Sequence, residues 1–323
     1  MYLLCMFLMF QEPTLDVEKR IPIKREISFY PGKMKMHSDG SITMLSESTV
    51  FHFDQAGKLI RKFGKHGQNP GELYSPSRVV FNGANYYVTD FNAALQMFDA
   101  SGAYVNREMG YQVNVDATSK GNVFVTLLKH LKRNEQGHSQ RGDVLCKLVD
   151  NKLCDENSMF GPISEVNAKV QFRGAQHFVA EDENIHVIGQ LEPTIYTYSN
   201  DFKPVGKINF SAPDWVQSKK GLPKERTRKA IMGYWNSFSR FYGLWKYNEK
   251  EFLVFYMTPD SSTSLGFKSV IARVGLDGTL TKPAFRFDGV FLGPHGSKVY
   301  FLEHREDEEE VWPVYTLKGF TWE

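Results

Sequence analysis

The feature that most constrains the fold of this chain is the stretch from Phe63 to Val105. A glycine-punctuated turn region is followed by four apolar runs of about five residues, separated by Asn, Asp and Gly. Short runs rich in Val, Tyr and Phe between such turn residues are typical of consecutive antiparallel strands. Four strands in roughly forty residues is the size of one β-propeller blade. The four runs are 77–81, 85–89, 94–98 and 103–107.

The same stretch resembles the NHL repeat. The shared features are Phe63-Gly64, Pro-Gly-Glu-Leu at 70–73, Tyr-Val-Thr-Asp at 87–90 and Gln-Met-Phe-Asp at 96–99. This resemblance implies a closed propeller, most often with six blades. By itself it implies no particular activity, because one propeller fold hosts many functions.

Further blades can be traced on both sides of this repeat. A weaker copy covers 33–63, and blades three to six are predicted to begin near residues 113, 175, 242 and 287. Leu280 to Pro283 is assigned as the fourth strand of blade five. Blade six lacks a fourth strand, which the alternating run Ile21 to Phe29 could supply, removing an exposed edge. We therefore predict an all-β, six-bladed β-propeller, closed by an N-terminal strand, as one domain over residues 21–323.

Two insertions interrupt the predicted blades. Lys129 to Gly142 is polar and is predicted as an exposed, mobile loop of blade three, with basic residues that hint weakly at an anionic partner. Ser211 to Arg240 is predicted to hold one helix between blades four and five, over Lys224 to Phe238. Apolar residues recur there at helical spacing after Pro223, a suitable first helical residue. This helix should lie across one face of the propeller.

The charge of the chain bears on its partners, and its N-terminal segment bears on its cellular compartment. The 39 basic and 37 acidic residues nearly balance, which gives no reason to expect a nucleic-acid partner. Residues 1–10 are apolar but too few to span a bilayer, and they resemble the apolar region of a secretory signal. We therefore separate residues 1–20 from the domain and expect export to the periplasm, cell envelope or medium. A lipid anchor at Cys5, or a buried segment of a cytoplasmic protein, are the alternatives.

Three cysteines leave at least one thiol unpaired. Cys146 and Cys154 flank a predicted hairpin turn at Asp150-Asn151. A three-residue loop would let the two cysteines face each other, whereas a two-residue loop would put them out of register. The state of this pair therefore stays open, with two free thiols as the favoured alternative.

No nucleophile elbow, phosphate loop, dinucleotide-binding glycine pattern or paired-cysteine zinc site occurs in the sequence. The NHL-like resemblance implies that innermost strands line a central channel, in which some related lyases and lactonases hold a metal. The corresponding channel candidates here are His37, Arg78, Asn114 and His177. Arg78 would repel a cation, so we predict no metal site; Ca²⁺ or Zn²⁺ held by His37 and His177 is the alternative.

The segment from Tyr234 to Tyr247 is half aromatic. Flat rings could form a stacking platform for a sugar or peptide, because they bury area at low entropic cost. The favoured interpretation is that these rings seal the helix onto blade five. If they contact a ligand, the rim candidates are Trp235, Phe238, Tyr242 and Trp245.

These observations favour a binding or scaffold protein over an enzyme. We expect a monomer without a transmembrane span that presents one face to a protein, peptide or glycan. The alternative is a metal-dependent hydrolase or lyase, lactonase-like or amidating-lyase-like, with its site in the channel. A third idea is an intracellular scaffold.

The acidic run Glu303 to Glu310 lacks the pattern of a calcium loop and is predicted as a solvated hairpin tip.

Overall fold

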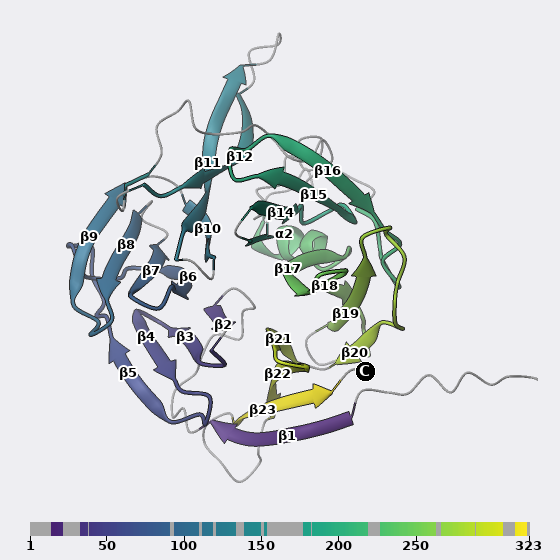
Figure 1. The fold of residues 1–323 in the computed structure, drawn as a ribbon, viewed down its shortest axis with the longest axis horizontal. Coiled ribbons are helices and arrows are strands. Elements are labelled where there is room, and N and C mark those ends of the chain that lie inside the picture. Colours follow the sequence, from purple (N-terminus) through teal and green to yellow (C-terminus); the bar gives the residue numbers. More distant parts are fainter. Residues whose placement is uncertain are drawn as a thin grey trace, which may run out of the picture.

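The computed structural model shows six antiparallel sheets arranged around a ring (Figure 1). Five sheets have four strands and one has three. The predicted all-β, six-bladed propeller is therefore confirmed. The structure describes residues 14–21, 33–37, 39–90, 94–109, 112–118, 121–133, 139–149, 152–153, 177–181, 183–218, 227–262, 266–287, 289–305 and 314–321.

Blades one and two follow the predicted strands closely. Blade one contains β2 (Met34–Met36), β3 (Ile42–Ser46), β4 (Thr49–Phe53) and β5 (Leu59–Phe63). Blade two contains β6 (Pro76–Phe81), β7 (Asn85–Asp90), β8 (Ala94–Asp99) and β9 (Tyr104–Met109). Gly64 links them at a φ of 92°, where a Cβ would lie 2.7 Å from the Ser48 carbonyl oxygen. Only glycine fits this turn without strain.

Blade three contains β10 (Gln112–Ala117), β11 (Val123–Arg133) and β12 (Ser139–Lys147). The predicted loop from Lys129 to Gly142 is wrong for most of its length, because β11 and β12 continue as a paired ribbon beyond the blade. Lys129 pairs with Gly142, and Arg133 pairs with Ser139. Polar residues can extend a two-stranded ribbon because its backbone groups bond to each other rather than to a core.

Cys146, on β12, takes part in a disulfide, so the prediction of free thiols is wrong for this residue. The two other cysteines, Cys5 and Cys154, lie outside the described residues. The adjoining turn has a two-residue loop, since Val149 and Lys152 exchange both backbone hydrogen bonds at 3.0 and 2.9 Å.

Blade four begins close to the predicted residue 175 and contains β13 (His177–Ala180), β14 (Asn184–Ile188), β15 (Thr194–Ser199) and β16 (Pro204–Asn209). Blade five contains β17 (Arg240–Asn248), β18 (Glu251–Pro259), β19 (Phe267–Gly275) and β20 (Phe285–Phe287). The predicted fourth strand at Leu280 to Pro283 is wrong, because Leu280 makes only an isolated bridge to Val274. Phe285 and Phe287 form the outer strand instead and pack against Phe301 of blade six.

Blade six contains β21 (Val290–His295), β22 (Lys298–Arg305) and β23 (Val314–Thr321), and β1 (Thr14–Ile21) pairs with β23. The N-terminal closure of the ring is therefore confirmed. The strand that closes it precedes the predicted run Ile21 to Phe29, of which only Ile21 is described. The strand pairs with β23 from Thr14 to Ile21, with a register shift between Leu15 and Val17.

The helix α2 (Arg228–Trp235) lies within the predicted helical insert, and it is shorter than the predicted Lys224 to Phe238. It ends in a turn in which the amide of Ser237 donates to the carbonyl of Tyr234 at 3.1 Å. The Ser237 hydroxyl donates to the same carbonyl at 2.6 Å. These two bonds occupy the carbonyl that would otherwise continue the helix. No helix among the described residues is long and apolar enough to cross a membrane.

The core is divided into six buried clusters, one at each seam between neighbouring blades. The seam between blades six and one, for example, buries Met36 and Met44 against Leu292. Because each blade contributes to two seams, the ring is stabilised around its whole circumference. The innermost strands are thereby held in fixed positions around the central channel.

Candidate functional site

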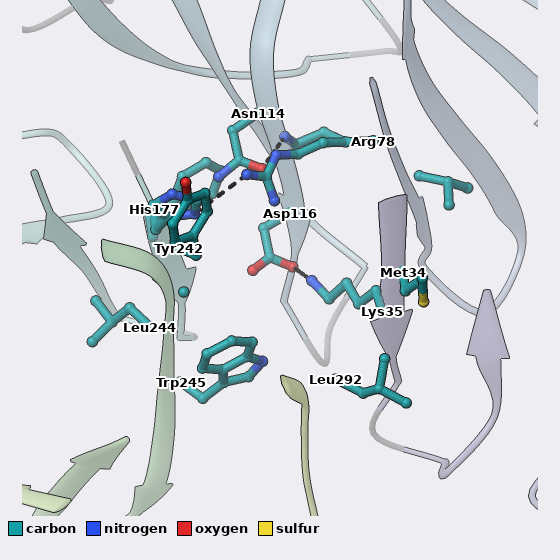
Figure 2. A pocket seen from close by; sticks show the side chains of 14 residues that line it. Met34, Lys35, Arg78, Asn114, Asp116, His177, Tyr242, Leu244, Trp245 and Leu292 are labelled. Atoms are coloured by element: carbon teal, nitrogen blue, oxygen red, sulfur yellow. Dashed lines mark hydrogen bonds and ion pairs between the residues drawn. The ribbon is translucent and has the colours of Figure 1, made fainter. Parts of the chain in front are cut away.

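A pocket opens where the innermost strands of all six blades surround the central channel. Each strand contributes to its lining: β2, β6, β10, β13, β17 and β21. Its free volume is about 50 Å³, which is room for roughly four water molecules. Figure 2 shows the labelled side chains around this one space. One lining residue from each strand, in chain order, is Lys35, Arg78, Asn114, His177, Tyr242 and Leu292.

Four of the six innermost strands carry a bulge near their start. A β-bulge inserts one unpaired residue, increases the local twist and changes the direction of neighbouring side chains, and bulges are common next to functional sites. Tyr242 and Leu292 are such unpaired residues, while Arg78 and Asn114 directly follow one. The register shifts lie between Pro76 and Arg78, Gln112 and Asn114, Phe241 and Gly243, and Phe291 and Gly293.

One side of the pocket joins Arg78 to His177. Arg78 Nη2 lies 3.4 Å from His177 Nδ1, and because a guanidinium can only donate, this ring nitrogen accepts. The other ring nitrogen, Nε2, lies 3.5 Å from Nε2 of Gln190. Burial, followed by the charge of Arg78, holds the pKa of His177 well below its usual value. His177 is therefore neutral at physiological pH.

The opposite charges of the pocket are paired with each other. Lys35 Nζ donates to Asp116 Oδ1, which also accepts a hydrogen bond of 2.7 Å from the amide of Ala117. Asn114 is buried beside this pair, with its Oδ1 accepting from the amide of Val115 at 2.9 Å. The charged residues among the described lining are thus two cations, Lys35 and Arg78, and one carboxylate.

Trp245 provides an aromatic wall whose position is fixed by glycines on two blades. A Cβ at Gly243 would lie 1.9 Å from Cη2 of the indole, and one at Gly293 would lie 3.1 Å from its Nε1. Phe291 packs edge-on against the same ring at 4.6 Å between centroids. The buried ring of Tyr242 lies 6.4 Å from that of His177, also between centroids.

Three of the four predicted channel residues come together in this pocket: Arg78, Asn114 and His177. His37 does not line it. That side chain is buried at the end of β2, where its Nε2 lies 2.9 Å from the hydroxyl of Thr43. Burial is the largest cause that lowers the pKa of His37 from 6.5 to about 3.

The four predicted rim residues do not form one surface. Tyr242 and Trp245 lie on the innermost strand β17 and line the pocket. Phe238 is 1% exposed and packs against Tyr234 at 5.0 Å between ring centroids. Trp235 is the last residue of α2, and its side chain lies outside the described part. The interpretation of these aromatics as a rim platform therefore misplaces Tyr242 and Trp245.

Sequence reasoning missed the roles of Lys35, Gly243 and Gly293, and it did not name Asp116 as a channel candidate. Bulges explain the omissions on β10, β17 and β21, because each shifts the side chains of an innermost strand by one position relative to simple alternation. They do not explain the omission of Lys35, because β2 pairs with β3 without a register shift. A glycine inside a strand was the available signal, since it marks a bulge or a close approach of other atoms. Gly243 and Gly293 both fit that description.

A cation has little support in this pocket. Within the described residues there is no group of three or more His, Cys, Asp or Glu side chains that could hold a metal. Arg78 lies beside the one histidine of the lining, and Lys35 is bonded to its one carboxylate. Both contacts place positive charge where a metal would need ligands. Of the acidic run, only Glu303, His304 and Arg305 are described, within β22.

Comparisons with known proteins agree with the architecture. A family model, DUF5128, described as a 6-bladed beta-propeller, matches residues 29–263. A search of curated protein sequences gives no significant match.

Solved structures with the same fold have little sequence in common with this chain. A protein from Bacteroides fragilis has a TM-score of 0.57 at 10% identity, covering 95% of this chain and 94% of its own. A luciferin-regenerating enzyme has a TM-score of 0.54 at 9% identity, covering 95% of each. The calcium-binding protein regucalcin from Agrobacterium tumefaciens has a TM-score of 0.53 at 10% identity, covering 94% and 95%. At such identities the likeness concerns the fold alone.

Proposed function

Because the chain belongs to the DUF5128 family of six-bladed β-propellers, we propose that it is a binding module whose ligand enters the mouth of the central channel. The observation that carries this proposal is the pocket itself, to which all six innermost strands contribute. Concave sites with an apolar wall and a few convergent polar groups are the usual form of ligand sites. Here Trp245 supplies the wall, and Arg78, Asn114 and Asp116 supply polar groups.

Binding is favoured over catalysis because the titratable groups of the pocket are poorly suited to proton transfer. A general base works best with a pKa near the operating pH. The pKa of His177 is held well below that range by burial and by Arg78. The one carboxylate of the described lining, Asp116, is neutralised by Lys35. A metal-dependent hydrolase or lyase, the alternative, finds no ligand set among the described residues.

The partner we propose is a protein, peptide or glycan, of which one small group enters the channel while the remainder lies on the face around it. The pocket volume of about 50 Å³ supports this division, since a whole sugar ring or side chain of a large residue would not fit inside. We propose further that the protein is a monomeric, NHL-type propeller. Export is supported by the disulfide of Cys146, because disulfides persist in oxidising compartments.

The test is a ligand screen with a pocket variant and a surface control. Short peptides, oligosaccharides and organic acids would be added to the wild type, to Asn114→Ala and to Val205→Ala, an exposed change on β16. Ligand-observed NMR would measure binding, and mass spectrometry would measure turnover. We expect hits that bind the wild type and Val205→Ala but bind Asn114→Ala at least about tenfold more weakly. Hits indifferent to Asn114→Ala would place the site elsewhere, and product formation would identify an enzyme.

A further inference from the structure

We propose that the group recognised inside the channel is a single carboxylate attached to an apolar or aromatic body, with Arg78 as its binding residue. This inference rests on the proposed function, because it names the ligand class of the same pocket. It is carried by the charge of the lining, the chemistry of Arg78 and the size of the pocket. Figure 2 shows Arg78 among Asn114, His177 and Asp116.

The described lining carries one net positive charge. Lys35 and Arg78 each contribute one positive charge, Asp116 contributes one negative charge, and His177 is uncharged. Inside a narrow channel, where the effective dielectric constant is lower than in water, such an imbalance attracts an anion more strongly than it would at the surface. A monoanion would balance the charge of the described lining.

Arg78 has the geometry that a carboxylate requires. A guanidinium is planar, remains charged and can donate two parallel hydrogen bonds to the two oxygens of a carboxylate. The contact with Nδ1 of His177 helps to orient the guanidinium at the start of the channel. Since His177 is neutral, this contact does not itself neutralise the charge of Arg78.

Size and charge favour a carboxylate over a phosphate. Room for roughly four water molecules accepts a planar three-atom head group and little more. A phosphate monoester carries about 1.5 to 2 negative charges at neutral pH, more than the single positive charge of the lining can balance. The body of the ligand would then lie toward Tyr242 and Trp245, whose rings are already fixed in place.

Benzoate, benzamide and phenyl phosphate are suitable probes, because they share a ring and differ in the charge of the head group. Titrations of the full chain by ligand-observed NMR would compare their affinities. We expect benzoate to bind roughly ten- to a hundredfold more tightly than benzamide, the range of a charge-assisted bidentate contact. Benzoate should also bind more tightly than phenyl phosphate.

Three variants locate the charge that is responsible. Arg78→Met, similar in length but neutral, should lose roughly ten- to a hundredfold of benzoate affinity. Asp116→Asn should gain affinity by several-fold, because it removes the negative charge facing the anion. Arg286→Met, which breaks an exposed ion pair with Asp214, should leave the affinity unchanged. The melting temperature of each variant would show that the propeller remains folded.

Each contrary result has a distinct meaning. Equal binding of benzoate and benzamide, or no effect of Arg78→Met in a folded variant, would overturn the carboxylate assignment. Tighter binding of phenyl phosphate would replace it with phosphate. Failure of benzoate to bind at millimolar concentration would also overturn it, while the separate screen of neutral peptides and glycans against Asn114→Ala would still decide whether the channel mouth is a binding site.

Discussion

His37 and His177 are equivalent in the sequence pattern, since both fall on innermost strands, yet they lie in different surroundings. His177 borders the channel pocket, where Arg78 faces one ring nitrogen. His37 lies in the seam between blades one and two, with its ring 5.8 Å from that of His52 and 6.3 Å from that of Phe81. The same residue type therefore contributes to a binding site in one blade and to a seam in another.

The seam around His37 is closed by polar and aromatic side chains that pack on one another. His52 Nδ1 lies 2.7 Å from the hydroxyl of Tyr86, while its Nε2 is buried with no hydrogen-bond partner among the described residues. The rings of Phe63 and Phe81 pack on Tyr86 at 4.8 and 4.5 Å between centroids. Val79 of β6 borders both this seam and the pocket, whereas the charged residues of the described lining, Lys35, Arg78 and Asp116, do not belong to the buried cluster of the seam. The comparison predicts that the seam controls stability and the pocket controls binding.

The largest effect is expected from Tyr86→Ala, which removes the ring at the centre of the seam. Tyr86 is 2% exposed, so the variant leaves a cavity and should lower the free energy of unfolding by about 3–5 kcal/mol. Urea unfolding followed by circular dichroism would measure it. Tyr104→Ala, at a side chain 41% exposed, is the matched control and should cost less than about 1 kcal/mol. Similar losses in both variants would contradict a seam that dominates stability.

The second-largest effect is expected in the wild type, whose free energy of unfolding should fall at acidic pH. The pKa values of His37, His52 and His177 are all lowered, chiefly by burial, so the folded protein keeps these rings neutral while the unfolded chain binds protons below about pH 6.5. Stability should therefore be full above that pH and fall as the pH drops toward about 3, the folded pKa of His37. The midpoint of urea unfolding, measured from about pH 7 to about pH 4, would show this.

The variant His37→Gln separates the seam from the other titrating groups. Glutamine can still bond to Thr43 but does not titrate, so the fall in stability between about pH 6 and pH 4 should become shallower. Val205→Ala, an exposed change that involves no titratable group, is the control and should leave the slope unchanged. An unaltered slope in His37→Gln would mean that other groups, such as carboxylates, govern acid unfolding.

The sequence predicted the repeat but not the detail of the channel. Blades one and two were accurate because alternation, turn residues and the FD-xx-G turn at 53–57 and 98–102 agree there. The error at Lys129 to Gly142 arose where two strands pair without a continuous apolar run, and the error at Leu280 arose where the outer strand, Phe285–Phe287, is only three residues long. Propensity alone does not report such pairing, because it depends on the neighbouring strand.

The candidate site could also be predicted only in part from the sequence. Placing Arg78, Asn114 and His177 on innermost strands followed from counting strands. The burial of His37 in a seam, and the position of Trp245 at the channel rather than the rim, depend on which way each side chain points. For Trp245, the bulge at Tyr242 sets that direction, and a bulge is an irregularity that a periodic pattern cannot reveal.

A smaller and more specific effect is expected at the pocket. Arg78→Met should change the free energy of unfolding by less than about 1 kcal/mol, because Arg78 is half-buried at the channel mouth. The pKa of His177 should rise but stay below its usual value, since Arg78 is only the second cause of its depression after burial. An NMR pH titration of the His177 ring would measure the shift. A pKa that does not move would show that Arg78 does not act on this histidine.

The smallest effect on stability is expected for Lys35→Met. Lys35 and Asp116 are bonded but remain 25% and 14% exposed at their side chains, and ion pairs open to solvent contribute about 0–1 kcal/mol. Urea unfolding should therefore barely distinguish Lys35→Met from the wild type, while benzoate affinity should fall because Asp116 loses its counter-charge. The conservative variant Lys35→Arg should restore both charge and affinity. A loss of stability as large as that of Tyr86→Ala would instead make this pair part of the structural ring, and the separation between seam and pocket would fail.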